Sequence, residues 1–203
     1  MLKYAKHFVL QSYILILASL LFGLALAVTN AAWSPRIEQN RKEKLEILMK
    51  GLITQAETFE ELPEQVELDS GRGKTIEVAV YKAVSQDGRC LGWAFNARGS
   101  GFADKIELVV AADEKFTTLA GFNVLSSNET PGFGDKIKQP YYRSQFAGAP
   151  AAEYELSKTG DSRKIDAEIV AISGATVSSQ AVVDILNNYI GQIKKTLQDR
   201  GLI

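Results

Sequence analysis

The stretch Ser173-Gly174-Ala175-Thr176 lies between two patterns of regular secondary structure. The apolar run at 169–172 predicts a strand before it, and the apolar periodicity that begins near Val177 predicts a helix after it. A strand, a turn of small residues and a helix N-terminus together form a site for an anion such as phosphate, because the first helical turn offers unpaired N–H groups. The Thr176 hydroxyl is placed either to bond such a phosphate or to be esterified by it. An ordinary capped helix is the competing interpretation.

Composition narrows the chemistry that the chain can perform. The 203 residues hold 23 basic and 24 acidic side chains, which argues against a nucleic-acid partner, since such a partner favours a clustered basic face. Cys90 and His7 are the single residues of their types, so a disulfide, a His/Cys zinc site and an iron–sulfur site within this chain are excluded. No metal ligand set is predicted. Demanding chemistry would therefore come from a cofactor.

The N-terminal segment predicts a membrane anchor. No Asp, Glu, Lys or Arg occurs from Phe8 to Pro35, which meets the ~20 residues that a bilayer requires. We assign a transmembrane anchor to 8–28, with residues 1–7 cytoplasmic because Lys3 and Lys6 precede the apolar run. The remainder would lie outside the cytoplasm of a bacterial-type inner membrane, attached by a single pass. The alternative is a cleaved signal peptide with its site near 25–27, although the apolar run is long for one.

The rest of the chain predicts one α+β domain, a twisted and mainly antiparallel sheet with packed helices. Ser34-Pro35 resembles a helix start, so 29–73 is predicted as a membrane-proximal helix followed by an irregular connector at 57–73. This helix would pack on the domain through an apolar face formed by Ile37, Leu45, Leu48, Met49 and Leu52. Residues 74–203 form the main domain. Strand patterns at 76–84, 90–95, 106–110 and 117–125, with a hairpin signal at 87–88, predict a meander with one buried face. A short helix near 141–146, a possible strand at 154–156 and a strand within 164–172 precede the helix after 176.

A second informative loop spans residues 128–136. Pro131 stiffens its entry, and Gly132 and Gly134 are able to adopt positive φ and admit a flat ligand. Phe133 between the glycines would either stack on an aromatic ligand or plug the core of a Pro-Gly turn. The Gly99-x-Gly101 pair lacks a third glycine and a following helix, so it fails as a dinucleotide fingerprint.

The two loops, 129–137 and 172–179, stand about forty residues apart behind one membrane segment. In this order they resemble the FMN-binding domain family. The chain is most similar to the G subunits of Rnf electron-transport complexes, with the C subunits of sodium-pumping NADH:quinone oxidoreductases as near relatives. The resemblance covers nearly the whole chain.

The resemblance implies a covalent flavin. In the family, the threonine of the Ser/Thr-Gly-Ala-Thr motif carries FMN through a phosphoester that a separate flavin transferase installs from FAD, and this threonine corresponds to Thr176. Ser173, Gly174 and Ala175 would serve recognition and clearance, and the helix N-terminus from Val177 to Ser179 would stabilise the phosphate charge. The turn formed by Glu129, Thr130, Pro131, Gly132, Phe133 and Gly134 is implied to contact the flavin ring.

The implied function is electron transfer within a membrane Rnf-type ion-translocating ferredoxin:NAD oxidoreductase complex, rather than activity as a stand-alone enzyme. Its partners would be the other membrane subunits, the flavin transferase and the lipid bilayer. The corresponding subunit of the sodium-pumping quinone oxidoreductase is one alternative. A membrane-anchored extracytoplasmic binding or assembly module without flavin is an alternative of another class.

Overall fold

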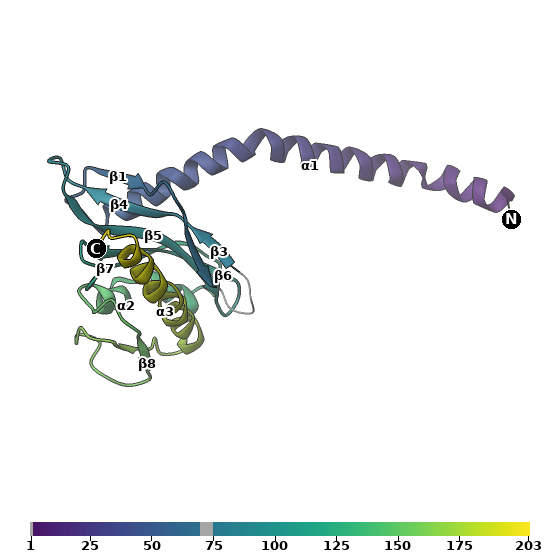
Figure 1. Cartoon of the computed structure of the whole chain (residues 1–203). Helices are drawn as coiled ribbons and strands as arrows, with labels where there is room; N and C mark the ends of the chain where they lie inside the picture. Colours follow the sequence, from purple (N-terminus) through teal and green to yellow (C-terminus); the bar gives the residue numbers. More distant parts are fainter. Residues whose placement is uncertain (1, 70–74) are drawn as a thin grey trace. The chain divides into compact units, whose positions relative to one another are not determined.

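The computed structural model describes residues 2–69 and 75–203, and the chain divides into two compact units between Glu43 and Lys44 (Figure 1). The last four residues of the predicted connector, 70–73, lie outside the described part.

Helix α1 (Leu2–Lys50) contains the apolar N-terminal segment and continues without interruption through Ser34-Pro35. The expectation that a new helix begins at Ser34 was therefore wrong. Pro35 removes one backbone hydrogen bond, but the helix persists through it, with the good helix formers Ala31, Ala32 and Arg36 nearby. Within the described residues, α1 is the one helix that is long and apolar enough to cross a membrane, and the large apolar side chains of its N-terminal part, such as Leu15, Leu20 and Phe22, are exposed. The described part of the chain thus has a single candidate membrane span.

The second unit is built on a five-stranded antiparallel sheet in the order β1-β4-β5-β6-β7. These strands are Thr58–Glu61, Val80–Val84, Cys90–Ser100, Lys105–Asp113 and Leu119–Ser127. The predicted mainly antiparallel sheet is confirmed, and the β4–β5 hairpin turns at Gly88, which has φ of +77°. Together with the packed helices, the sheet makes the predicted α+β fold.

Strands β1, β2 and β3 correct the expectations for 57–73 and 76–84. Strand β1 and strand β2 (Val66–Asp69) occupy the predicted connector, because Phe59, Val66 and Leu68 find apolar surface to cover. The predicted strand 76–84 is divided at Ala79 into β3 (Thr75–Val78), which pairs with β2, and β4, which joins the large sheet. Strands β8 (Glu155–Ser157) and β9 (Glu168–Val170) form a parallel pair.

Helix α3 (Thr176–Asp199) packs on one face of the large sheet (Figure 1). Its apolar stripe, which includes Val182, Leu186 and Ile193, is buried in a cluster with Phe95 and Val110 from the strands.

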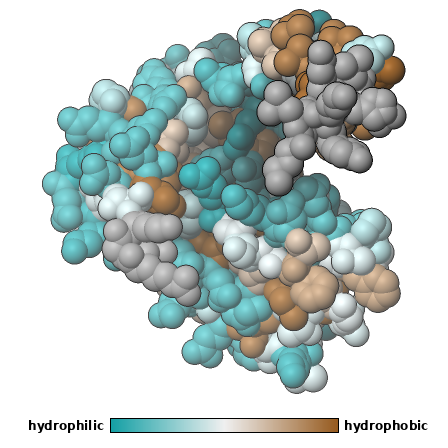
Figure 2. Space-filling view, turned by 90° about the vertical axis from the view of Figure 1, so that its right-hand side faces the viewer, coloured by the Kyte–Doolittle hydropathy of each residue, from teal (hydrophilic) through white to brown (hydrophobic). Residues whose placement is uncertain are grey.

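The predicted short helix near 141–146 is α2 (Pro140–Arg143) with the 3₁₀ turns η1 (Gly134–Lys138) and η2 (Ser144–Phe146) on either side. On the side shown in Figure 2, hydrophilic residues cover most of the surface and hydrophobic residues form small patches.

The other face of the sheet is also buried, contrary to the expectation of a single buried face. Met49, on the last turn of α1, packs with Ala94, Val109, Ala111 and Leu125. Two hydrogen bonds fix this turn: the side-chain amide of Asn123 donates to the Leu48 carbonyl at 3.0 Å, and the Lys44 ammonium donates to the Leu125 carbonyl at 2.5 Å. Small strand residues leave room for the helix, which is why the sheet is covered on both faces.

This packing predicts how the unit depends on the end of α1. In a chain that begins near Trp33, which should fold, Met49→Ala is expected to lower the free energy of unfolding by about 2–5 kcal/mol because it leaves a cavity. Ile47→Ala is the matched control, since Ile47 is on the same helix and is 68% exposed. Chemical denaturation followed by circular dichroism measures both. Equal losses in the two variants would contradict the packing.

Candidate functional site

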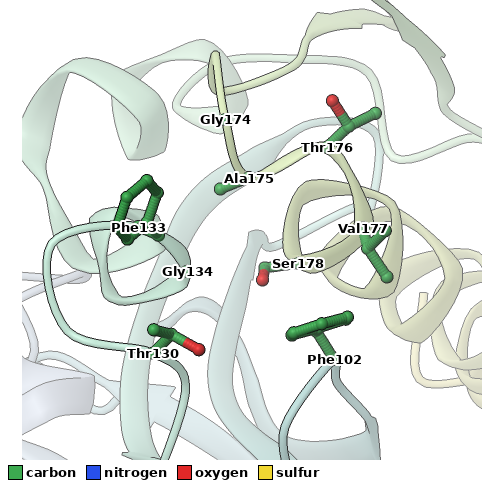
Figure 3. A pocket seen from close by; sticks show the side chains of 9 residues that line it. All are labelled: Phe102, Thr130, Phe133, Gly134, Gly174, Ala175, Thr176, Val177 and Ser178. Carbon is green, nitrogen blue, oxygen red and sulfur yellow. The ribbon is translucent and has the colours of Figure 1, made fainter.

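A pocket of about 440 Å³ lies where the β5–β6 loop, the glycine-rich turn and the start of α3 meet (Figure 3). Seven residues singled out from the sequence line it, and Phe102 and Ser178 complete the lining. The seven are Thr130, Phe133, Gly134, Gly174, Ala175, Thr176 and Val177. The remaining predicted residues, Ser173, Glu129, Pro131 and Gly132, are not among the lining side chains. Two motifs far apart in the sequence therefore form one concave site.

The N-terminus of α3 opens into this pocket without a side-chain cap. Thr176 is the first helical residue and Ala175 is the N-cap, and no side chain bonds the cap position. An ordinary capped helix needs a side-chain oxygen at its N-cap residue to accept a hydrogen bond, and the alanine side chain has none. The interpretation of this turn as an ordinary capped helix therefore does not hold. The half-buried Thr176 side chain lies beside the backbone N–H groups of the first turn. These donors carry the positive end of the helix dipole.

The glycine-rich turn places Phe133 at the pocket rather than in the core. The Thr130 carbonyl accepts hydrogen bonds from the N–H groups of Phe133 and Asp135 at 3.2 and 3.3 Å, and Gly132 has φ of +77°. Phe133 is 56% exposed, so the interpretation of this residue as a core plug does not hold. A Cβ atom on Gly174 would lie 3.6 Å from the Phe133 ring, so the Ser-Gly-Ala-Thr turn and the glycine-rich turn lie close to one another.

Phe102 lines the pocket, although no pattern in the sequence predicted a role for it. It lies in the β5–β6 turn, is 67% exposed and stands across the pocket from Phe133 in Figure 3. The register of β5, β6 and β7 brings this turn beside the glycine-rich loop, where the Asn128 amide donates to Asp104 at 2.8 Å. This hydrogen bond holds the pKa of the Asp104 carboxyl below its usual value. The pocket thus presents an aromatic ring on each of two facing loops.

Glu129 lies behind the pocket and connects its three segments. Its side chain is 4% exposed, and its two carboxylate oxygens accept from different partners: the Ala103 N–H at 3.0 Å and the Ser178 hydroxyl at 2.5 Å. A Cβ atom at Gly134 would lie 2.6 Å from the oxygens of both Glu129 and Ser178, and one at Gly101 would overlap the other Glu129 oxygen. Both glycines are therefore required by the buried carboxylate.

Comparison with known proteins agrees with this geometry. The FMN-binding domain family matches residues 101–191, a span that contains every residue lining the pocket. The G subunit of the ion-translocating oxidoreductase complex of Methanosarcina acetivorans is 31% identical to this chain over 179 residues, which are 88% of this chain and 90% of that protein. The chain belongs to this family of G subunits.

Two further similarities accompany the family assignment. The G subunit of the Na(+)-translocating ferredoxin:NAD(+) oxidoreductase complex of Acetobacterium woodii is 28% identical and covers 86% of each chain. The crystal structure of NqrC from Shewanella oneidensis has the same fold, with a TM-score of 0.55, 21% sequence identity and coverage of 72% of this chain and 73% of that one.

A second buried serine of this family member, Ser179, secures the approach to α3. Its hydroxyl accepts from the Ile172 N–H at 3.1 Å and donates to the Ala175 carbonyl at 3.0 Å. The Tyr142 hydroxyl donates to the Ser179 carbonyl at 3.1 Å. Burial raises the pKa of Tyr142 well above its usual value, so its hydroxyl keeps the proton that it donates. Ser179 does not line the pocket, whereas its neighbour Ser178 does.

The close contact at Gly134 predicts a stability effect. Gly134→Ala is expected to destabilise the flavin-free chain by about 1–3 kcal/mol, because the new methyl group would collide with the Glu129–Ser178 hydrogen bond. The control is Gly191→Ala in α3, where a Cβ meets no atom within 4 Å and a gain of up to about 1 kcal/mol is expected from helix propensity. Thermal unfolding distinguishes the two, and a neutral Gly134→Ala would contradict the geometry.

Proposed function

We propose that this chain is an electron-transfer subunit that carries FMN, bound through Thr176, in a membrane ion-translocating oxidoreductase complex of the Rnf type. The observation that carries the proposal is the meeting of both motifs of an FMN-binding domain around one pocket, with Thr176 at an uncapped helix N-terminus. We place this function in residues 74–203, which contain the whole pocket lining.

The residues present fit FMN chemically. The first-turn N–H groups of α3 supply donors for a phosphate, and Thr176, the first residue of that turn, lines the pocket. Phe102, Phe133 and Val177 are exposed apolar side chains at the pocket, which suits the faces of a flat ring. The Glu129 carboxylate, the nearest buried acid, is occupied by hydrogen bonds behind the lining. When bound, FMN supplies reversible electron transfer, which the side chains of this chain do not provide.

The attachment is proposed as a phosphoester. A flavin transferase would use FAD: the Thr176 hydroxyl oxygen forms a bond to the phosphorus on the FMN side, the pyrophosphate bond breaks, AMP leaves and the hydroxyl proton is released. The helix N-terminus would stabilise the remaining negative charge of the diester. A phosphate tether leaves the ring free, so contacts from the two loops would set its redox properties.

Thr176→Val tests the attachment. The chain is expressed with a flavin transferase, denatured and separated by electrophoresis, and flavin fluorescence is measured on the polypeptide. The wild-type chain should keep its flavin and Thr176→Val should lose it, because valine preserves the shape but has no hydroxyl. Thr130→Val is the matched control, since Thr130 lines the same pocket. Fluorescence that persists in Thr176→Val, or is absent from a correctly exported wild-type chain, would overturn covalent attachment.

The membrane partners follow from α1. Its exposed apolar side chains would pack against lipid and against other subunits of the complex. The C subunit of a sodium-pumping NADH:quinone oxidoreductase remains the second candidate, supported by the shared fold with NqrC. The 31% identity over 90% of a G subunit favours the Rnf-type complex.

The orientation is a separate prediction. Lys3 and Lys6 before the apolar run and the absence of other charges before Arg36 favour a cytoplasmic N-terminus, so the pocket would lie outside the cytoplasm. Alkaline phosphatase fused after Ile203 should therefore be active in a bacterial host. Activity of a cytoplasmic reporter at the same position, with an inactive phosphatase, would reverse the orientation.

A further inference from the structure

Ser178 lines the pocket with a buried hydroxyl group whose proton is used in a hydrogen bond to Glu129. Its side chain is 3% exposed, it lines the pocket, and Figure 3 places it among the other lining side chains. The hydroxyl donates to Glu129 at 2.5 Å, a length typical of a hydrogen bond to a charged oxygen. A serine hydroxyl has one proton and two acceptor lone pairs. The interaction with Glu129 therefore leaves only lone pairs to face the pocket.

The other oxygen of Glu129 keeps this arrangement in place. It accepts the Ala103 N–H at 3.0 Å, so each carboxylate oxygen has a donor of its own. A carboxylate offers acceptors only, and a buried carboxylate is costly unless its oxygens are bonded. Release of the Ser178 proton toward the pocket would leave one of these oxygens unpaired, which burial disfavours.

We propose that Glu129 makes Ser178 a hydrogen-bond acceptor inside the pocket, and that Ser178 binds a donor group of the cofactor. This inference rests on the proposed FMN site. Phosphate oxygens are acceptors and would be repelled by the Ser178 lone pairs, so the phosphate lies at the α3 N–H groups and the donor-bearing part of FMN lies at Ser178. Glu129 is thus a positioning residue that acts through Ser178.

The donors of FMN fall into two groups. The ribityl hydroxyls and the ring N3–H are present in both redox states, whereas the ring gains a further N–H, at N5, when it is reduced. A bond to a donor of the first group stabilises oxidised and reduced flavin alike and leaves the redox potential nearly unchanged. A bond to the new N–H stabilises only the reduced form and raises the potential.

Glu129→Gln reverses the polarity of Ser178. The introduced amide has one acceptor and one donor end, so its NH₂ group must face either the Ala103 N–H or Ser178. Two N–H donors face each other in the first orientation, which favours the second. Ser178 then accepts from the introduced amide and its own proton is turned into the pocket, where it opposes the donor on FMN.

The experiment uses the detergent-solubilised full chain, expressed with and without flavin transferase. Ser178→Ala and Glu129→Gln are compared with wild type, with Ser178→Thr as the variant that keeps the hydroxyl and with Ser179→Ala as the matched control beside it. Two quantities are measured: the midpoint potential of the loaded chain, and the gain in Tm from flavin-free to flavin-loaded oxidised chain.

The readouts separate the two donors. If Ser178 accepts the N–H that the ring gains on reduction, Ser178→Ala and Glu129→Gln lower the potential by ~30 mV, which is a tenfold change in relative affinity for a two-electron couple, and the gain in Tm is kept. If Ser178 accepts a donor present in both redox states, a ribityl hydroxyl or the ring N3–H, the potential is kept and the gain in Tm falls by about half or more. Ser178→Thr should resemble wild type.

Ser179→Ala should lower the Tm of the flavin-free chain and that of the flavin-loaded chain by the same amount. The midpoint potential and the gain in Tm on loading should then stay at their wild-type values. If Ser178→Ala changes neither the potential nor the gain in Tm beyond this control, the acceptor role of Ser178 is overturned, and Ser178→Ala decides this even where Glu129→Gln fails to fold. A wild-type chain that takes up no flavin would instead overturn the proposed function.

Discussion

The hydrogen bonds of one buried carboxylate hold the pocket together. Glu129 lies on the glycine-rich loop, its first oxygen binds the β5–β6 turn at Ala103, and its second binds α3 at Ser178. A buried charge must be paired with donors, so these three segments are fixed relative to one another. The need for close approach also explains two glycines, Gly101 and Gly134, which have no room for a side chain.

The sheet and its two coverings support this arrangement. Helix α3 is buried along one face, so its N-terminus is directed from a rigid element into the pocket. The last turn of α1 covers part of the other face through Met49. The same helix contains the apolar N-terminal segment, so α1 contributes both the membrane anchor and part of the hydrophobic core. Removal of the anchor alone should therefore leave the flavin site formed, provided that residues 44–50 are retained.

Local patterns in the sequence predicted the elements that depend on local rules. The antiparallel meander, the turn at Gly88 and the helix after Thr176 follow from alternation, turn chemistry and helical periodicity. Three features depend on contacts between elements rather than on local pattern. The apolar helix face that contains Met49 was expected to pack on the domain, but its place on the second face of the sheet was not. The division at Ala79 depended on the pairing of β3 with β2, and Phe102 reached the site through strand register. Glu129 was expected at the flavin ring, and only the folded chain shows it bonded to Ser178 behind the pocket.

We propose that Thr176 holds the flavin in this pocket. Trypsin should release residues 165–194 as one peptide, in which Thr176 is the single threonine, beside Ser173, Ser178 and Ser179. Fragmentation mass spectrometry of this peptide, prepared from a chain matured with a flavin transferase, measures which hydroxyl carries FMN. We expect FMN on Thr176 alone. An unmodified peptide from such a chain, or FMN on one of the serines, would contradict it.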